Sequence, residues 1–207
     1  MTNLIGRAGL LGAGPFFAGG LALMQPQMTA AADGAGFLGS IALEPAAWIN
    51  GHILMLVAAG LYALAGSAVT RTLEGQGRPL AGQLIGLPLI AGAVLLGGNF
   101  ALDFVYAALV NGMDLETANA VRTTLISDPI LPTIFSAAGP AIWLLGMASL
   151  ALYALITGAV SRLTGVLILA GWGIVMGLHG AFPYAEALGH FTVGAGFGLV
   201  AFARSDA

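Results

Sequence analysis

Residues 48–69 read WINGHILMLVAAGLYALAGSAV, an apolar run with one ionisable side chain, His52. A helix that crosses the hydrocarbon core of a bilayer needs about 20 predominantly apolar residues, and this run is long enough. The whole chain follows the same pattern, because 58% of its 207 residues are hydrophobic and 7% are charged. Soluble domains carry about 25% charged residues. The sequence therefore predicts an all-α, polytopic membrane protein.

Five further apolar stretches qualify as spans, so we predict one integral-membrane helical domain over residues 1–207 with six transmembrane helices. The expected spans are about residues 4–24, 48–69, 80–110, 134–156, 163–182 and 183–202. The first span precedes Ala30-Ala31-Ala32 and so imitates a secretory signal, but we expect it to be retained. Between spans, we expect a short helix within residues 34–47. A second one should be capped by Asp114 and stopped at Asp128-Pro129.

The arginines predict the orientation of the bundle. With alternating spans, one side carries five of them and the other carries Arg122 alone; the five are Arg7, Arg71, Arg78, Arg162 and Arg204. By the positive-inside rule, both termini are then cytoplasmic, in a multi-pass protein of the bacterial inner membrane. Glycine-rich stretches at residues 12–14, 173–177 and 194–198 are interpreted as helix-packing positions.

Composition excludes several kinds of chemistry. Lysine is absent, which removes Schiff-base reactions, and cysteine is absent, which removes thiolate metal sites and disulfides. A net charge of −3 gives no basic surface for nucleic acid. No phosphate loop or hydrolase triad spacing occurs, so catalytic residues are unknown and enzymatic activity is undecided.

Asp103 and the three histidines, His52, His179 and His190, are ionisable residues that lie well inside the expected spans. Such residues are costly in a membrane and are functional candidates by default. At 1.5 Å per residue, each lies about 5–10 Å inward of its outer span end, so we expect one layer near the outer face.

The runs GHILMLVAAGLYA at 51–63 and GHFTVGAGFGLVA at 189–201 share a Gly-His frame on helices of the same direction. Small residues below each histidine would leave room for a flat ligand. We therefore predict b-type haem with His52 and His190 as axial ligands, carrying electrons near the periplasmic face; bacteriochlorophyll is the alternative ring. The pattern Trp48-x-x-Gly51-His52-x3-Leu56-x3-Gly60 resembles the haem-ligating helix of haem–copper oxidase relatives. Because the other histidines depart from that family's pattern, no family is assigned.

Three alternatives remain open. All four residues could form a transition-metal site, with His52, His179, His190 and Asp103 as ligands. Asp103 could instead pair with a protonated histidine as a proton relay, or accept hydrogen bonds from Asn99 and Tyr106. Finally, the chain could bind no cofactor and serve as an accessory subunit of a respiratory or photosynthetic complex. Its partners would then be lipid and other membrane subunits.

Overall fold

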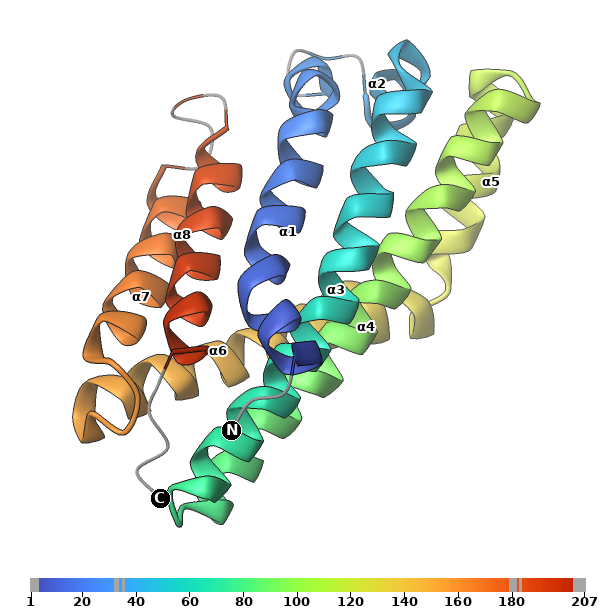
Figure 1. The fold of residues 1–207 in the computed structure, drawn as a ribbon. Coiled ribbons are helices and arrows are strands. Elements are labelled where there is room, and N and C mark those ends of the chain that lie inside the picture. The colour runs from blue at the N-terminus through green and yellow to red at the C-terminus, as the bar shows by residue number, and fades with distance from the viewer. Residues whose placement is uncertain (1–3, 32–33, 35, 179–181, 183, 203–207) are drawn as a thin grey trace.

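The computed structural model describes residues 4–31, 34, 36–178, 182 and 184–202, and all regular elements in these ranges are helical (Figure 1). In chain order the elements are α1 (Leu4–Ala30), α2 (Phe37–Leu43), α3 (Pro45–Gly75), α4 (Pro79–Gly112), α5 (Leu115–Ser127), η2 (Pro132–Ala138), α6 (Gly139–Thr157), α7 (Arg162–Gly177) and α8 (Ala185–Val200). The element η2 is a π-helical segment that continues directly into α6. The all-α prediction is confirmed.

Among the described residues, four stretches are long and apolar enough to cross a membrane: α1, α3, α4 and the continuous η2–α6 segment. These helices agree with a multi-pass membrane protein. By contrast, α7 and α8 each contain 16 residues. At 1.5 Å per residue each is about 24 Å long, which is less than the roughly 30 Å hydrocarbon core. The helix α7, which corresponds to the fifth expected span, is thus shorter than the expected range of residues 163–182.

The helices pack in an order that brings distant parts of the chain together. α1 lies between α3 and α8, α4 packs on both α3 and α6, and α7 packs on both α6 and α8. Aromatic side chains fill the centre: Phe17 of α1 stacks against Trp143 of α6, and Tyr62 of α3 contacts Trp143 and Phe197 of α8. These contacts close a ring of helices in which α1 joins α3 to α8.

Two glycines set the contact between α1 and α8. A Cβ atom built on Gly14 would lie 2.3 Å from the Cα of Gly194, so only glycine fits at this crossing. The prediction of packing glycines is confirmed there, as expected where small residues let backbones approach. It is wrong for Gly173 and Gly177, because a Cβ at either one would meet no atom within 4 Å.

Both expected short helices are present. α2 occupies the first connection, and α5 begins at its N-cap Asp114, whose side chain accepts a hydrogen bond from the Thr117 backbone N–H at 2.9 Å. α5 packs against α4 and α2, and Figure 1 shows it folded back beside the C-terminal half of α4. This return of the chain forms one wall of the cavity described below.

Candidate functional site

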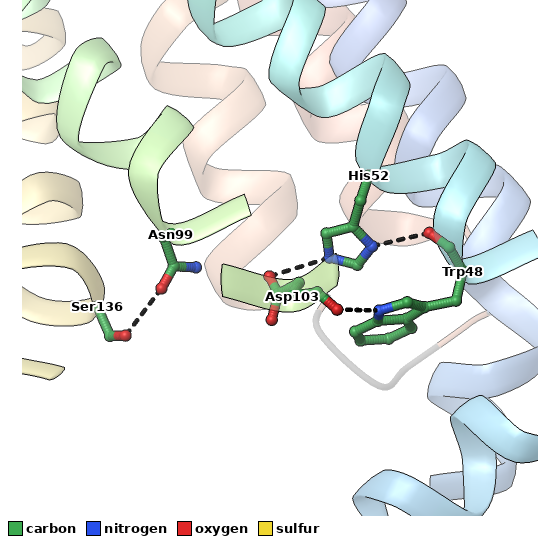
Figure 2. A network of polar contacts seen from close by, with 5 residues as sticks. All are labelled: Trp48, His52, Asn99, Asp103 and Ser136. Atoms are coloured by element: carbon green, nitrogen blue, oxygen red, sulfur yellow. Dashed lines mark hydrogen bonds and ion pairs between the residues drawn. The ribbon is translucent and has the colours of Figure 1, made fainter. Parts of the chain in front are cut away.

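A buried polar contact joins His52 of α3 to Asp103 of α4. Nε2 of His52 lies 3.0 Å from Oδ2 of Asp103, and the two side chains are 3% and 16% exposed (Figure 2). The indole N–H of Trp48 donates to the backbone carbonyl of Asp103 at 3.2 Å. α3 and α4 are thus connected by two polar contacts side by side.

The second ring nitrogen of His52 determines where the protons are. Nδ1 lies 2.9 Å from the backbone carbonyl oxygen of Trp48, one helical turn earlier. A carbonyl oxygen only accepts hydrogen bonds, so Nδ1 carries a proton and donates it. The contact between Nε2 and Oδ2 then needs one further proton between them. Whether that proton is on the imidazole or on the carboxyl group, the pair as a whole has no net charge.

Aromatic rings surround the imidazole of His52. The ring of Trp48 is centred 4.3 Å from it, and Phe100 and Phe104 each present an edge-on ring at 6.3 Å. Polar interactions strengthen in such low-dielectric surroundings. Breaking this buried pair is therefore costly, because the remaining partner would keep its desolvation penalty.

A cavity of about 490 Å³ opens beside Asp103, between α4, α5 and η2. Its volume falls in the range typical of small-molecule sites, about 300–1,000 Å³. Polar groups from three elements line it: Asn99, Asp103 and Tyr106 of α4, Arg122 of α5 and Ser136 of η2. The remaining wall is apolar and consists of Leu102, Val105, Leu125, Ile126, Leu131 and Pro132. An apolar chamber with a few converging polar groups is the usual form of a ligand site.

Asn99 and Ser136 close one side of this cavity. The Ser136 hydroxyl donates to the side-chain oxygen of Asn99 at 2.8 Å, which links η2 to α4. The amide nitrogen of Asn99 stays available as a donor and points toward the side of Asp103 (Figure 2). The suggestion that Asn99 donates to Asp103 is therefore wrong for this structure: the side-chain partner recorded for Asp103 is His52.

The other described histidine, His190 of α8, lies in a different environment. Its imidazole is 6% exposed and packs between Phe17, Trp143 and Trp172, with ring centroids 4.3, 6.0 and 5.3 Å away. Its Nδ1 atom is buried without a hydrogen-bond partner. The space expected below it, at Gly194, is filled by Gly14 of α1.

The structure does not bring His52 and His190 into contact through their rings. Their ring contacts run instead through two phenyl groups, from His52 to Phe100 at 6.3 Å, on to Phe17 at 5.6 Å, and then to His190 at 4.3 Å. Because both nitrogens of His52 already have partners, binding to iron would require it to release one of them. Bis-histidine haem ligation stays a prediction.

The structure places two of the four residues of the expected metal site together. His52 and Asp103 are together, His190 is packed elsewhere, and His179 lies outside the described residues. Among the residues that the structure does describe, no group of three or more His, Cys, Asp or Glu side chains is placed to hold a metal ion. The full set of ligands stays a prediction.

Sequence reasoning missed Arg122 and Ser136 as site residues. In the sequence, Arg122 indicates only the orientation of the bundle in the membrane, and Ser136 is a single polar residue near the start of an apolar run. Ser136 belongs to the π-helical segment, and such segments are frequent at functional sites. The one usable signal was Pro132 ahead of Ser136, since proline disturbs regular α-helical hydrogen bonding.

Comparisons with known proteins give no assignment: no protein-family model matches the chain, and no curated protein or solved structure is significantly similar to it.

Proposed function

We propose that this chain is an integral-membrane binding protein that takes a small amphiphilic molecule into the cavity between α4, α5 and η2. The His52–Asp103 pair acts there as the proton-exchanging group. The observation that carries the proposal is the position of Asp103, which both lines the cavity and lies 3.0 Å from His52. A ligand that contacts Asp103 in the cavity would therefore affect the proton that Asp103 shares with His52.

The apolar walls favour an amphiphile over a fully polar solute. Apolar side chains of α4, α5 and the η2 region cover most of the cavity, and a polar solute would lose its hydration against them without compensation. A molecule with one polar end and one hydrocarbon end satisfies both parts of the surface. Such molecules partition into bilayers, so the membrane itself would supply the ligand.

In this proposal the chain has six spans, counting the shorter α7 and α8, and both termini are in the cytoplasm of a bacterium. The beginning of α1, the α3–α4 turn and the α6–α7 turn lie at one end of the bundle in Figure 1. Arg7, Arg71, Arg78 and Arg162 belong to or adjoin those segments. This clustering supports a cytoplasmic face there. The cavity would then lie in the periplasmic half of the membrane.

Filling the cavity tests the proposal. In nanodiscs, the purified protein should bind a dansyl-labelled long-chain alcohol, and Leu125→Trp should abolish that binding because the indole takes the ligand's place. Leu115→Trp is the matched control, because both leucines belong to α5 and are similarly exposed, Leu115 by 43% and Leu125 by 38%. Of these two leucines, only Leu125 lines the cavity. Equal binding by both variants would reject the cavity as the site.

A second candidate function is the haem protein predicted from the Gly-His frames. His190 favours it, because its buried Nδ1 has no hydrogen-bond partner among the described residues, and axial ligation of haem requires an imidazole nitrogen that can bind iron. One absorption spectrum tests it: a Soret band that shifts on reduction and is lost in His190→Ala supports haem. A colourless, metal-free preparation that still binds the dansyl probe supports the first proposal. Co-purifying membrane proteins would indicate the accessory-subunit alternative.

A further inference from the structure

Among the described residues that line the cavity, Arg122 is the one whose charge has no counter-charge in contact with it. It forms no salt bridge with a carboxylate among the residues that the structure describes, where His52–Asp103 is the recorded ion pair. Its Nε atom is buried and has no hydrogen-bond partner. A buried donor without a partner costs free energy, so an acceptor brought by a ligand would be stabilising.

Two aromatic side chains, Phe37 and Tyr106, flank the Arg122 guanidinium. The guanidinium carbon lies 4.5 Å from the centre of the Phe37 ring and 5.7 Å from the centre of the Tyr106 ring. Stacking of this kind uses the flat face of the group. The N–H donors lie around its edge, in the fork geometry that matches a carboxylate or a phosphate.

The charge balance of the cavity also favours an anion. Asp103 would repel one if it were an isolated carboxylate, but it shares a proton with His52 and that pair has no net charge. Asn99 contributes amide N–H donors, because its oxygen is already used by Ser136. The formal charge of the cavity lining is therefore the single positive charge of Arg122.

We infer that the ligand of this cavity is a single-chain amphiphile with an anionic oxygen head group, a carboxylate or a phosphate, held by Arg122. The inference rests on the proposed function and adds the class of ligand. The head group would take its hydrogen bonds from Arg122 and Asn99, and the hydrocarbon chain would lie along Leu125, Ile126 and Leu131.

Displacement of the neutral dansyl-labelled alcohol from protein in nanodiscs tests the inference with three competitors: dodecanoate, dodecyl phosphate and 1-dodecanol. The wild type should prefer at least one anion over dodecanol by about tenfold or more, as expected for charge-assisted hydrogen bonds. The anion that binds better distinguishes a fatty-acid carboxylate from a phosphate ester as the natural head group.

Arg122→Gln should remove the preference for the anion and leave displacement by dodecanol unchanged, while Arg122→Lys should keep part of it. Arg78→Gln is the control, because Arg78 precedes α4 and hydrogen-bonds Tyr153, away from the cavity lining. If Arg122→Gln fails to fold, Arg122→Met takes its place, because it also removes the charge: a preference for the anion that survives in that variant overturns the inference.

The outcomes separate this inference from the proposed function. Equal displacement by all three competitors, or a preference that survives Arg122→Gln, overturns the anion inference while the cavity stays the site. Failure of wild-type protein to bind the dansyl probe or any competitor rejects the proposed function itself.

Discussion

His52 and Asp103 face each other across the α3–α4 contact with Nε2 and Oδ2 3.0 Å apart, and the Trp48 carbonyl oxygen lies 2.9 Å from the opposite nitrogen of His52. The imidazole is thus held between an obligatory acceptor and a carboxyl group that can give or take a proton. His52 and Asp103 therefore form an acid–base pair. The contact with the Trp48 carbonyl oxygen assigns one proton to Nδ1 of His52.

The proton on Nδ1 can be observed directly. We expect ¹⁵N NMR of selectively labelled His52 to show a protonated Nδ1, because the Trp48 oxygen can only accept. Tyr106 and Arg122 line the same cavity as Asp103, so neither residue should be mutated in the protein used for this measurement. An Nδ1 signal typical of an unprotonated nitrogen would contradict the proton assignment.

Two replacements of Asp103 should differ in their effect on stability. In Asp103→Asn the amide N–H can donate to Nε2 of a neutral His52, so the free energy of unfolding should fall by less than about 1 kcal/mol. Asp103→Leu leaves Nε2 buried and unpartnered, which should cost about 1–3 kcal/mol. Unfolding in mixed micelles by SDS measures both, and the exposed Asp128→Asn serves as control. Equal losses for Asn and Leu would argue against the hydrogen bond.

The crossing of α1 and α8 should tolerate no side chain. Gly194→Ala places a Cβ 2.5 Å from the Cα of Gly14, and such overpacking costs about 1–3 kcal/mol of stability. Gly60→Ala is a matched control within a helix, because its Cβ would meet no atom within 4 Å. The melting temperature should fall for the first variant and stay unchanged for the second. Equal melting temperatures would mean that the two helices are farther apart than described.

Asp114 should titrate below its usual range. Its pKa is lowered first by the backbone N–H of Thr117 and then by the Thr117 hydroxyl, both of which favour the charged carboxylate. A lowered folded-state pKa means that the cap stabilises α5 above the unfolded pKa of about 3.9 and is lost as pH falls through the folded value. A ¹³C NMR titration of the carboxyl group should show this. Thr117→Ala should raise the midpoint, and Thr123→Ala should not.

Much of the fold was predictable because the physics is local. Apolar runs of membrane length mark α1, α3 and α4, and Asp114 and Pro129 bound α5 through capping and backbone restriction. The meeting of His52 and Asp103 follows the expected layer of buried polar groups, since each residue lies at a similar depth on neighbouring helices.

The rest depends on which helix faces which, and the sequence contains little information about that. The helices are apolar on all sides, so no polar face identifies the direction of a partner. The position of α1 between α3 and α8, with Phe17 against His190, therefore could not be predicted, nor could the separation of His190 from His52. The cavity could not be predicted either, because it forms only where η2 and α5 pack beside α4. That packing brings Ser136 and Arg122 close to α4.

The site of ligand binding can be measured most directly by photo-crosslinking. A long-chain fatty acid with a diazirine in its tail, bound to the protein in nanodiscs and irradiated, should label peptides that contain Leu125, Ile126 and Leu131. We predict that Leu125→Trp removes this labelling and that Leu115→Trp retains it. Labelling spread over the lipid-facing surfaces of α1 and α4, at equal levels in both variants, would contradict the account.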